Sequence, residues 1–246
     1  MSAAPRVALV QIRSPGHRGA ELQEQACFLE RCGVEPERLV TLNVVAEPRF
    51  GRDRLGGADV LLIGGAGSHS VTEDHDFHAP LTDLVREWIE AGRPLFGSCW
   101  GHQFIAQALG GRVVTDRERE EVGTFDVELT PAAAADPLFG GLPSRFSAHF
   151  GHHDVVDELP PGVEELAWSE RCRNQALRVT GKPVYGTQFH CEMTLAQMRH
   201  RLGMYRQEYV TGAADFDAHL DRILAPTPVA ETLLERFLAA LRRGEL

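Results

Sequence analysis

The sequence lacks any apolar run long enough for a membrane-spanning helix, which needs roughly 20 such residues. The N-terminal stretch MSAAPRVALVQI also lacks the charged segment, apolar core and cleavage site that make up a secretory signal. Its apolar part is typical of a β-strand instead. We therefore expect a cytoplasmic protein with no membrane partner.

Positive charge is scarce as well. Lys and Arg number 25 against 35 Asp and Glu, which gives a formal net charge of -10 that is spread along the chain. No stretch of basic residues interleaved with aromatic residues offsets this negative charge locally. Because nucleic acids and anionic membranes bind patches of Lys and Arg, we expect neither as a partner.

Cysteine is present, but without the even number or the spacing of a disulfide framework. The cysteines are Cys27, Cys32, Cys99, Cys172 and Cys191. Reduced thiols in a cytosolic protein are the natural interpretation. Repeats, low-complexity segments and linkers rich in Gly, Pro or Ser are absent too, so we expect one domain over residues 1–246. Its core would span about residues 6–198, followed by a helical extension over about 199–246.

Short apolar runs alternate with helical patterns in the first part of the chain. Strands are predicted over residues 6–12, 39–45, 58–63 and 94–97, and helices over 20–32, 81–91 and 100–109. Strand-like runs follow at 124–130, 145–149, 166–168, 176–179 and 184–189, before helices begin at Thr194. Repeated strand–helix–strand order predicts an α/β fold with a mostly parallel open sheet and helices on both faces. A small β extension and a helical C-terminal tail would complete it.

The strongest chemical signal is the segment FGSCWGHQ over residues 96–103. A strand ends there, Cys99 lies in a tight turn flanked by glycines, and a helix begins. This arrangement is the thiol counterpart of a nucleophile elbow, and the adjacent helix N-terminus favours the thiolate. Taken alone, Cys99 would more often be a small buried core residue, but the full spacing of Gly, Cys and Gln favours the nucleophile.

A second signal is GTQFHCE over residues 186–192, at the end of an apolar strand. Positions i and i+2 of extended chain point to the same side, so Glu192 is expected to orient the His190 imidazole. The alternatives are a surface His–Glu pair, or a metal pair for which a third ligand at helical spacing is absent.

A third signal is the glycine-rich segment GGAGS at residues 64–68, after a buried strand. Its glycines let the backbone approach a ligand and present N–H groups to an anion. A phosphate-binding loop is the rival interpretation, but neither G-x-G-x-x-G nor a Lys-Ser/Thr ending is present. A plain turn is equally compatible with this segment alone.

Two histidine-rich stretches, residues 69–78 and 149–154, raise the alternative of a metal site. The first contains the cluster His69, Asp74, His75, Asp76 and His78. Its spacing matches no standard site, so a solvated loop is the better interpretation and no metal is expected.

In this order, the three motifs resemble those of class I (triad-type) glutamine amidotransferases over about residues 6–198. A weaker fourth motif, His152-His153-Asp154-Val155, is similar to the Ser-His-x-Asp-x-Val loop of members like guanosine-monophosphate synthetase. The resemblance implies a flavodoxin-like fold and a stand-alone member similar to the glutaminase domain of that synthetase.

The resemblance also implies a role for each motif. The Cys99 thiolate would attack the side-chain amide carbon of glutamine. His190, oriented by Glu192, would give a proton to the departing ammonia and then activate water. Backbone N–H groups of Gly65 and Trp100 would hold the oxyanion. The implied substrate-binding residues are Gly67, Gln103, Gly151, His153 and Asp154. No cofactor is implied.

The implied ligand is glutamine or a γ-glutamyl small molecule. Fewer than fifty residues follow Met198, too few for a synthetase domain, so the ammonia is expected to reach an unknown acceptor or a separate partner synthetase. One alternative is a γ-glutamyl peptidase or hydrolase, because the leaving-group pocket is not visible in the sequence. A catalytically silent regulatory or binding module is another, but the intact Cys99, His190 and Glu192 argue against it.

Three positions depart from the pattern of the family. Cys191 stands where Pro is usual, which frees the backbone between His190 and Glu192. Ala66 also stands where Pro is common, and Gly151 where Ser is common. None of these departures removes a chemical group that the mechanism needs.

Overall fold

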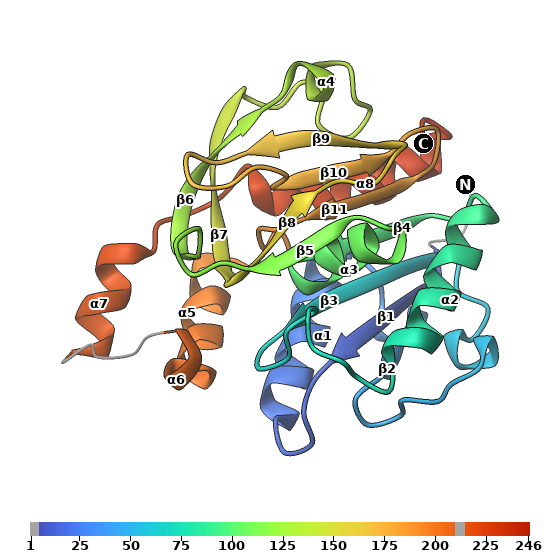
Figure 1. Cartoon of the computed structure of the whole chain (residues 1–246), viewed down its shortest axis with the longest axis horizontal. Coiled ribbons are helices and arrows are strands. Elements are labelled where there is room, and N and C mark those ends of the chain that lie inside the picture. Colours follow the sequence, from blue (N-terminus) through green and yellow to red (C-terminus); the bar gives the residue numbers. More distant parts are fainter. Residues whose placement is uncertain (1–4, 210–214) are drawn as a thin grey trace.

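The computed structural model describes residues 5–209 and 215–246, and a nine-stranded sheet forms its centre (Figure 1). Its parallel half contains β1 (Val7–Ile12), β2 (Leu39–Asn43), β3 (Val60–Ala66), β4 (Leu95–Ser98) and β11 (Val184–Thr187). Its antiparallel half contains β6 (Glu121–Leu129), β7 (Arg145–His152), β9 (Val163–Trp168) and β10 (Ala176–Val179). The strand order is β2-β1-β3-β4-β11-β10-β9-β6-β7. The predicted α/β class is confirmed, with a mixed sheet whose antiparallel half is the expected β extension.

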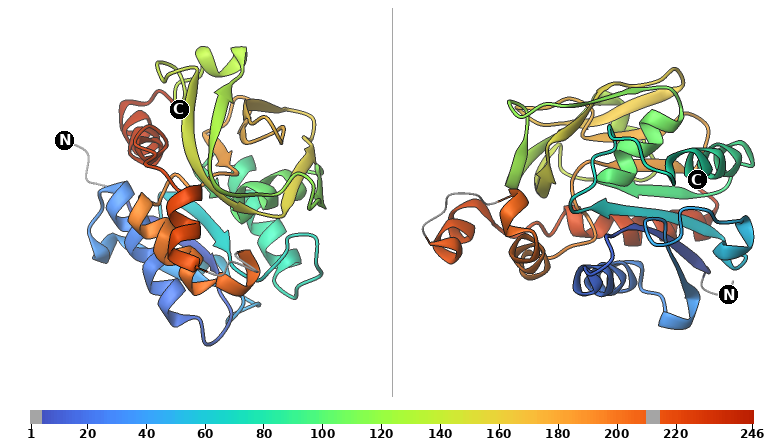
Figure 2. Two further views of the ribbon diagram at one scale, coloured as in Figure 1. Left: turned by 90° about the vertical axis from the view of Figure 1, so that its left-hand side faces the viewer. Right: turned by 60° about the horizontal axis from the view of Figure 1, so that its bottom comes forward.

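Helices cover both faces of the parallel half (Figure 2). One face carries α1 (Arg18–Cys32) and α8 (Leu233–Arg243), and the other carries α2 (His78–Glu90) and α3 (Trp100–Ala108). Alternate residues of β1 point to opposite faces, as the pleat requires. Val7 and Leu9 therefore join one apolar cluster with α1 and α8, and Ala8 and Val10 join the other with α2 and α3.

Local signals set several helix ends where they were predicted. Helix α1 ends at Gly33, whose φ of 58° is the left-handed conformation that glycine adopts without a Cβ penalty. Helix α5 (Leu195–Met204) begins after Thr194, whose hydroxyl accepts from the backbone N–H of Gln197 while the Gln197 side chain accepts from that of Thr194.

A two-stranded ribbon was not predicted. It pairs β5 (Arg112–Thr115) with β8 (Asp154–Glu158) in antiparallel order. The residues of β5 are only partly buried and show no alternation of apolar and polar side chains, so the pattern of a half-buried strand is missing there. The predicted strand at 145–149 also extends further, because β7 continues to His152.

The C-terminal segment lies across the edge of the sheet and then returns to the core. Helices α5, α6 (Arg206–Tyr209) and α7 (Phe216–Ile223) lie beyond the carboxyl ends of the parallel strands (Figure 1). After a short 3-10 turn at Ala230–Thr232, α8 packs beside α1. Its residues Leu233 and Phe237 are fully buried in the core. The predicted extension also includes residues 210–214, which lie outside the described residues.

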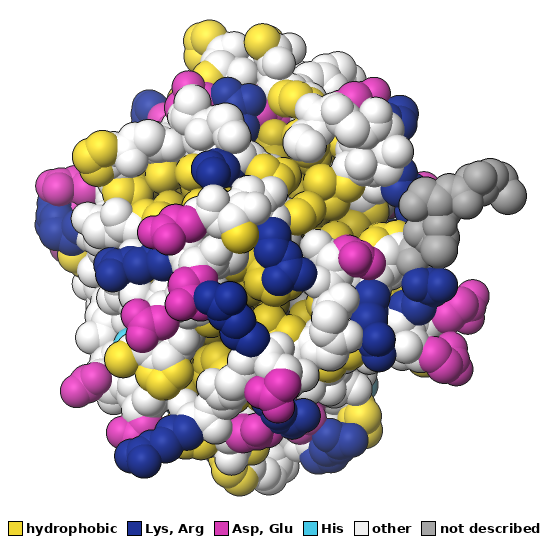
Figure 3. Space-filling model, turned by 90° about the vertical axis from the view of Figure 1, so that its right-hand side faces the viewer, with side chains coloured by type: hydrophobic (Ala, Val, Ile, Leu, Met, Phe, Trp, Pro, Cys, Tyr) yellow, Lys and Arg dark blue, Asp and Glu magenta, His cyan; other side chains and the backbone are white. Residues whose placement is uncertain are grey.

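The surface carries charges of both signs. Basic and acidic side chains are interspersed on the face that Figure 3 shows, with apolar side chains between them. Among the described residues, no helix combines the length and apolar character needed to cross a membrane. The cysteines are all unpaired and buried.

Candidate active site

Cys99 lies in the turn between β4 and α3. Its φ of 52° and ψ of -103° are unusual for a residue with a side chain, and such strain persists where surrounding structure enforces it. The flanking glycines are sterically required: a Cβ at Gly97 would overlap the backbone of Gly101, and a Cβ at Gly101 would overlap that of Ile63. The Cys99 N–H donates to Thr187 O at 2.8 Å, which ties the turn to β11. The chain therefore bends sharply and projects the Cys99 side chain.

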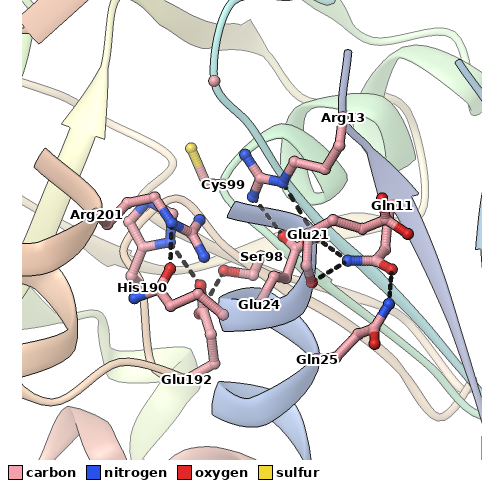
Figure 4. Close-up of polar contacts among 12 residues, drawn as sticks. Gln11, Arg13, Glu21, Glu24, Gln25, Ser98, Cys99, His190, Glu192 and Arg201 are labelled. Carbon is pink, nitrogen blue, oxygen red and sulfur yellow. Dashed lines mark hydrogen bonds and ion pairs between the residues drawn. The ribbon is translucent and has the colours of Figure 1, made fainter. Parts of the chain in front are cut away.

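His190 and Glu192 lie beside Cys99 in the loop after β11 (Figure 4). The imidazole Nδ1 lies 2.7 Å from Glu192 Oε1, and both side chains are buried. The His190 backbone N–H donates to His149 O at 2.8 Å, which fixes the loop against β7. The second carboxylate oxygen, Glu192 Oε2, accepts from Ser98 Oγ at 2.7 Å. The sequence-predicted Cys, His and Glu are thus brought together in one buried cluster.

The charges of this cluster support one another. Burial by itself lowers the pKa of His190, but the Glu192 carboxylate and a hydrogen bond with Cys99 raise it to about 10. Burial raises the pKa of Glu192, but the His190 imidazolium and the Ser98 hydroxyl lower it to about 2. At neutral pH the imidazole is therefore protonated and the carboxylate is ionised.

The glycine-rich turn lies directly against the cluster. A Cβ at Gly65 would lie 3.2 Å from His190 Cε1 and 3.7 Å from the Cβ of Cys99. Trp100, the first residue of α3, directly follows Cys99 in the chain. The two residues predicted to form an oxyanion hole thus both adjoin the nucleophile.

A pocket of about 540 Å³ opens in front of Cys99. All the predicted substrate-binding residues line it: Gly67, Gln103, Gly151, His153 and Asp154. The carbonyl oxygen of Gly151 lies 3.8 Å from Cys99 Sγ. Ser70 Oγ and Thr115 Oγ1 each donate to the Asp154 carboxylate at 2.6 Å, so that group is already bound within the protein.

Gln103 is engaged within the protein as well. Its Nε2 donates to Asp154 O at 2.8 Å and to Gln188 Oε1 at 3.0 Å. Both amide hydrogens are therefore used. Only the carbonyl oxygen of Gln103 is left to face a ligand in the pocket.

Comparison with known proteins now identifies the family. Residues 33–205 match the sequence profile of the family described as Glutamine amidotransferase class-I. The chain belongs to this family. Over 123 residues it is 36% identical to a subunit of the glutamine-hydrolysing GMP synthase of Thermococcus kodakarensis, covering 50% of this chain and 62% of that relative. The chain therefore spans less than two thirds of that relative.

Two further similarities cover more of the molecules. Over 151 residues the amidotransferase is 32% identical to the corresponding GMP synthase subunit of Methanopyrus kandleri, covering 61% of this chain and 74% of the relative. The crystal structure of a glutamine amidotransferase from Thermotoga maritima superposes with a TM-score of 0.71 at 21% identity, covering 96% of this chain and 97% of the other. At that identity the likeness bears on the fold alone.

Two contacts of the amidotransferase cluster were missed from the sequence. Gln188 Nε2 donates to Cys99 Sγ at 3.6 Å, which adds a hydrogen bond to the sulfur. The Ser98 hydroxyl holds the Glu192 carboxylate. Both residues stand inside the predicted motifs, so their position was visible, but which atoms they contact depends on how β4 and β11 pair.

The far wall of the pocket in this amidotransferase comes from the C-terminal segment. Gln207, Glu208 and Tyr209 line it. The Tyr209 hydroxyl donates to Gly67 O at 3.2 Å, and its ring stacks on His153 with centroids 5.0 Å apart and planes at 19°. Nothing in the sequence pattern of this segment indicates the contact.

The remaining cysteines of the amidotransferase differ from Cys99 in their surroundings. Burial raises the pKa of Cys27, Cys32 and Cys172 to about 12, and that of Cys191 well above its usual value. Cys191 is fully buried and accepts a hydrogen bond from Thr187 Oγ1. These thiols are held neutral by their burial.

In the loop with the clustered histidines, Asp74 and Asp76 are exposed as a solvated loop predicts, whereas the three histidine rings are half-buried. The His75 ring stacks on Phe77 and packs edge-on against His69 and His78. His69 also lines the pocket, and its Nε2 lies 2.9 Å from Ser14 Oγ. Within residues 5–209 and 215–246, no three His, Cys, Asp or Glu side chains are grouped to hold a metal ion.

Proposed function

We propose that this amidotransferase hydrolyses the side-chain amide of glutamine through a thioester on Cys99. The observation that carries the proposal is the buried cluster in which Cys99, on a strained turn at a helix N-terminus, adjoins the His190–Glu192 pair. A nucleophile beside a base that a third group orients is the arrangement that covalent acyl transfer needs.

In the first half of the reaction, the Cys99 thiolate attacks the amide carbon and the carbonyl oxygen becomes an oxyanion. The N–H groups of Gly65 and Trp100 would stabilise that charge, at the positive end of α3. The imidazolium of His190 gives its proton to the amide nitrogen, which leaves as ammonia. The carbon–nitrogen bond breaks and a γ-glutamyl thioester remains.

In the second half, neutral His190 accepts a proton from water, and the resulting hydroxide attacks the thioester carbon. The same N–H groups would hold the second oxyanion. The carbon–sulfur bond then breaks, which releases glutamate and restores the Cys99 thiolate. Glutamine and water are thereby converted to glutamate and ammonia.

The amino-acid end of glutamine is proposed to bind among the residues that line the pocket. The free Oε1 of Gln103 is an acceptor for the α-ammonium group. Gly67, Gly151 and His153 line the same space, and the bound carboxylate of Asp154 holds the loop at Ser70 in place.

The ammonia is proposed to pass to an acceptor held by a separate synthetase protein. The relatives from Thermococcus kodakarensis and Methanopyrus kandleri are each named as one subunit of a glutamine-hydrolysing GMP synthase. Because those relatives are named as parts of a larger enzyme, they support a partner protein for this chain too.

A second candidate is hydrolysis of γ-glutamyl amides larger than glutamine. The volume of the pocket, about 540 Å³, lies in the range of sites that hold drug-sized ligands. Such a substrate would use the same thioester and differ only in the amine that leaves.

Mass spectrometry of the protein after incubation with glutamine, and separately with γ-glutamyl dipeptides, tests both candidates. We expect a γ-glutamyl adduct on Cys99 that is absent from Cys99→Ala and present in the matched control Cys172→Ala. Faster adduct formation and turnover with dipeptides would select the second candidate. No adduct and no turnover with either substrate, in a folded protein, would contradict the proposed function.

A further inference from the structure

Figure 4 shows a buried ion pair between Arg13 and Glu24, and the Glu24 carboxylate lies against Gly64 of the glycine-rich segment. Arg13 follows β1, and its Nη2 lies 2.6 Å from Glu24 Oε1 of α1, while its Nε donates to Glu24 Oε2 at 3.2 Å. Both side chains are 0% exposed. Burial by itself lowers the pKa of Arg13, but Glu24 raises it above its usual value, so the guanidinium stays charged. Removing two charges from water costs free energy, so a fully buried ion pair is weak evidence of a purely stabilising role.

The Glu24 carboxylate of this ion pair lies against Gly64, the first residue of the glycine-rich segment. A Cβ at Gly64 would overlap the carboxylate of Glu24, so that carboxylate lies directly against the backbone. Gln11 Nε2 donates to Glu24 Oε2 at 2.8 Å, and Gln25 Nε2 donates to Gln11 Oε1 at 2.8 Å. The position of the carboxylate is therefore fixed from several sides.

Arg13 is also linked to Gly67, the last glycine of the segment, by way of Tyr205 in the C-terminal segment. Arg13 Nη1 donates to the hydroxyl of Tyr205 at 3.1 Å, and Tyr205 is buried. A Cβ at Gly67 would overlap the Tyr205 ring. One guanidinium thus holds the two groups that contact Gly64 and Gly67.

We propose that Arg13 is a positioning residue of the reaction, which fixes the Gly64–Gly67 turn by holding Glu24 against one end and Tyr205 against the other. The inference rests on the proposed function, in which Gly65, between these contacts, donates its N–H to the oxyanion. Pairing of β3 with β1 extends to Ala66, but Gly64, Gly65 and Gly67 carry no side chain that could hold this end of the strand against its surroundings. The contacts of Glu24 and Tyr205 supply that support, and a donor must be aligned before charge develops.

Two substitutions test this role. Arg13→Lys keeps the charge but cannot bind both Glu24 oxygens and Tyr205 at once. Tyr205→Phe keeps the ring on Gly67 and removes only the hydroxyl. The matched controls are Arg178→Lys in β10 and Tyr185→Phe in β11, which alter an Arg–carboxylate pair and a Tyr–carboxylate hydrogen bond at Asp136.

We expect kcat to fall about tenfold in Arg13→Lys and about threefold in Tyr205→Phe, with KM unchanged within about twofold. These losses are a fraction of the 10²–10³ that removal of a whole oxyanion donor costs. Affinity for a γ-aldehyde analogue of glutamine, whose thiol adduct carries an oxygen at the oxyanion position, should fall by the same factors. Alkylation of Cys99 by iodoacetamide, which forms no oxyanion, should stay within about twofold of the parent rate, as should both controls in every assay.

Several results would overturn the inference. Full kcat in both variants would show that the turn does not depend on Arg13. Equal losses of kcat and of the rate of Cys99 alkylation would indicate a general disturbance of the site instead. Melting temperatures of all four variants show whether each variant is folded. An unmodified, folded protein that forms no thioester would refute the proposed function itself, whereas an active parent with fully active variants would refute only this role of Arg13.

Discussion

The parallel half of the sheet and the C-terminal segment both build the pocket, but they do so by different means. In the parallel half, the strand ends themselves carry the chemistry, because Gly65 is the second-last residue of β3, Cys99 directly follows β4 and His190 lies in the loop after β11. The C-terminal segment contributes Tyr205 and Tyr209, which reach the glycine-rich turn only through tertiary packing. Reactive groups therefore lie on the rigid sheet, and the added segment shapes and holds the space around them.

If this division is correct, substitutions on the sheet side should change the chemical step, and so should loss of the Tyr205 hydroxyl, which acts through Arg13. Substitution of Tyr209, which lines the pocket, should change binding instead. Separate measurement of kcat and KM for variants of each region distinguishes an effect on the chemical step from an effect on binding.

Glu192→Gln should have the greatest effect of all. The amide cannot stabilise the charged imidazole of His190, and the corresponding loss in a serine protease triad is about 10⁴-fold in kcat. We expect a fall of about 10²–10⁴-fold in kcat, measured by glutamate release. A glutamine-like chloroketone should still label Cys99, because the sulfur remains in place. Loss of labelling together with a lower melting temperature would point to misfolding instead.

Ser98→Ala should lower kcat about tenfold, because Glu192 Oε2 loses its hydroxyl donor inside the protein. Without Pro at position 191 to restrict the backbone, this hydrogen bond and the contact with His190 hold the Glu192 carboxylate. Cys191→Pro alone should be tolerated, and added to Ser98→Ala it should recover part of the lost activity. Steady-state kinetics of the four proteins form a double-mutant cycle. Strict additivity would show that the two positions do not share the task of orienting Glu192.

Tyr209→Ala should affect binding and spare the chemical step. The substitution removes the stack on His153 and the hydrogen bond to Gly67 O, while leaving the cluster around Cys99 intact. We expect KM to rise about five- to tenfold with kcat retained, as for loss of an interaction made equally in ground and transition states. Tyr209→Phe keeps the stack and should lie between Tyr209→Ala and the parent. A fall in kcat at constant KM would erase the distinction between the two regions.

The dependence of stability on pH should be the weakest of these effects. The pKa of His190 is raised to about 10 in the folded protein, so its contribution is fully present below its ordinary pKa of 6.5 and is lost as pH rises toward 10. The pKa of Glu192 is lowered to about 2, so its contribution is present above 4.5 and is lost as pH falls toward 2. Urea unfolding of the parent and of His190→Gln from pH 6 to 10 should give a difference that shrinks with rising pH. A constant difference would contradict a charged His190.

The sequence predicts one of these two regions far better than the other. Glycines around Cys99 and the i, i+2 spacing of His190 and Glu192 are local signals, and the structure brings those residues together as expected. The partners of Ser98 and Gln188 depend on the register of β4 with β11, which no local pattern specifies. The ribbon of β5 and β8 carries too few alternating apolar residues to be recognised. The hydrogen bonds of Tyr205 with Arg13 and of Tyr209 with Gly67 join residues more than a hundred positions apart, and propensity carries no information on such pairs.

The return of α8 to the core has a consequence for any attempt to shorten the protein. A chain cut after Met198 would keep every motif residue yet lose Leu233, Leu234, Phe237 and Leu238, all of them buried. Burial of each such side chain contributes about 1.5–3 kcal/mol, against total stabilities of about 5–15 kcal/mol for ordinary domains. The apolar face of α1 that α8 covers would become exposed to water, and we expect the truncated protein to aggregate. For this amidotransferase the smallest sequence that contains the motifs is therefore not the smallest that folds.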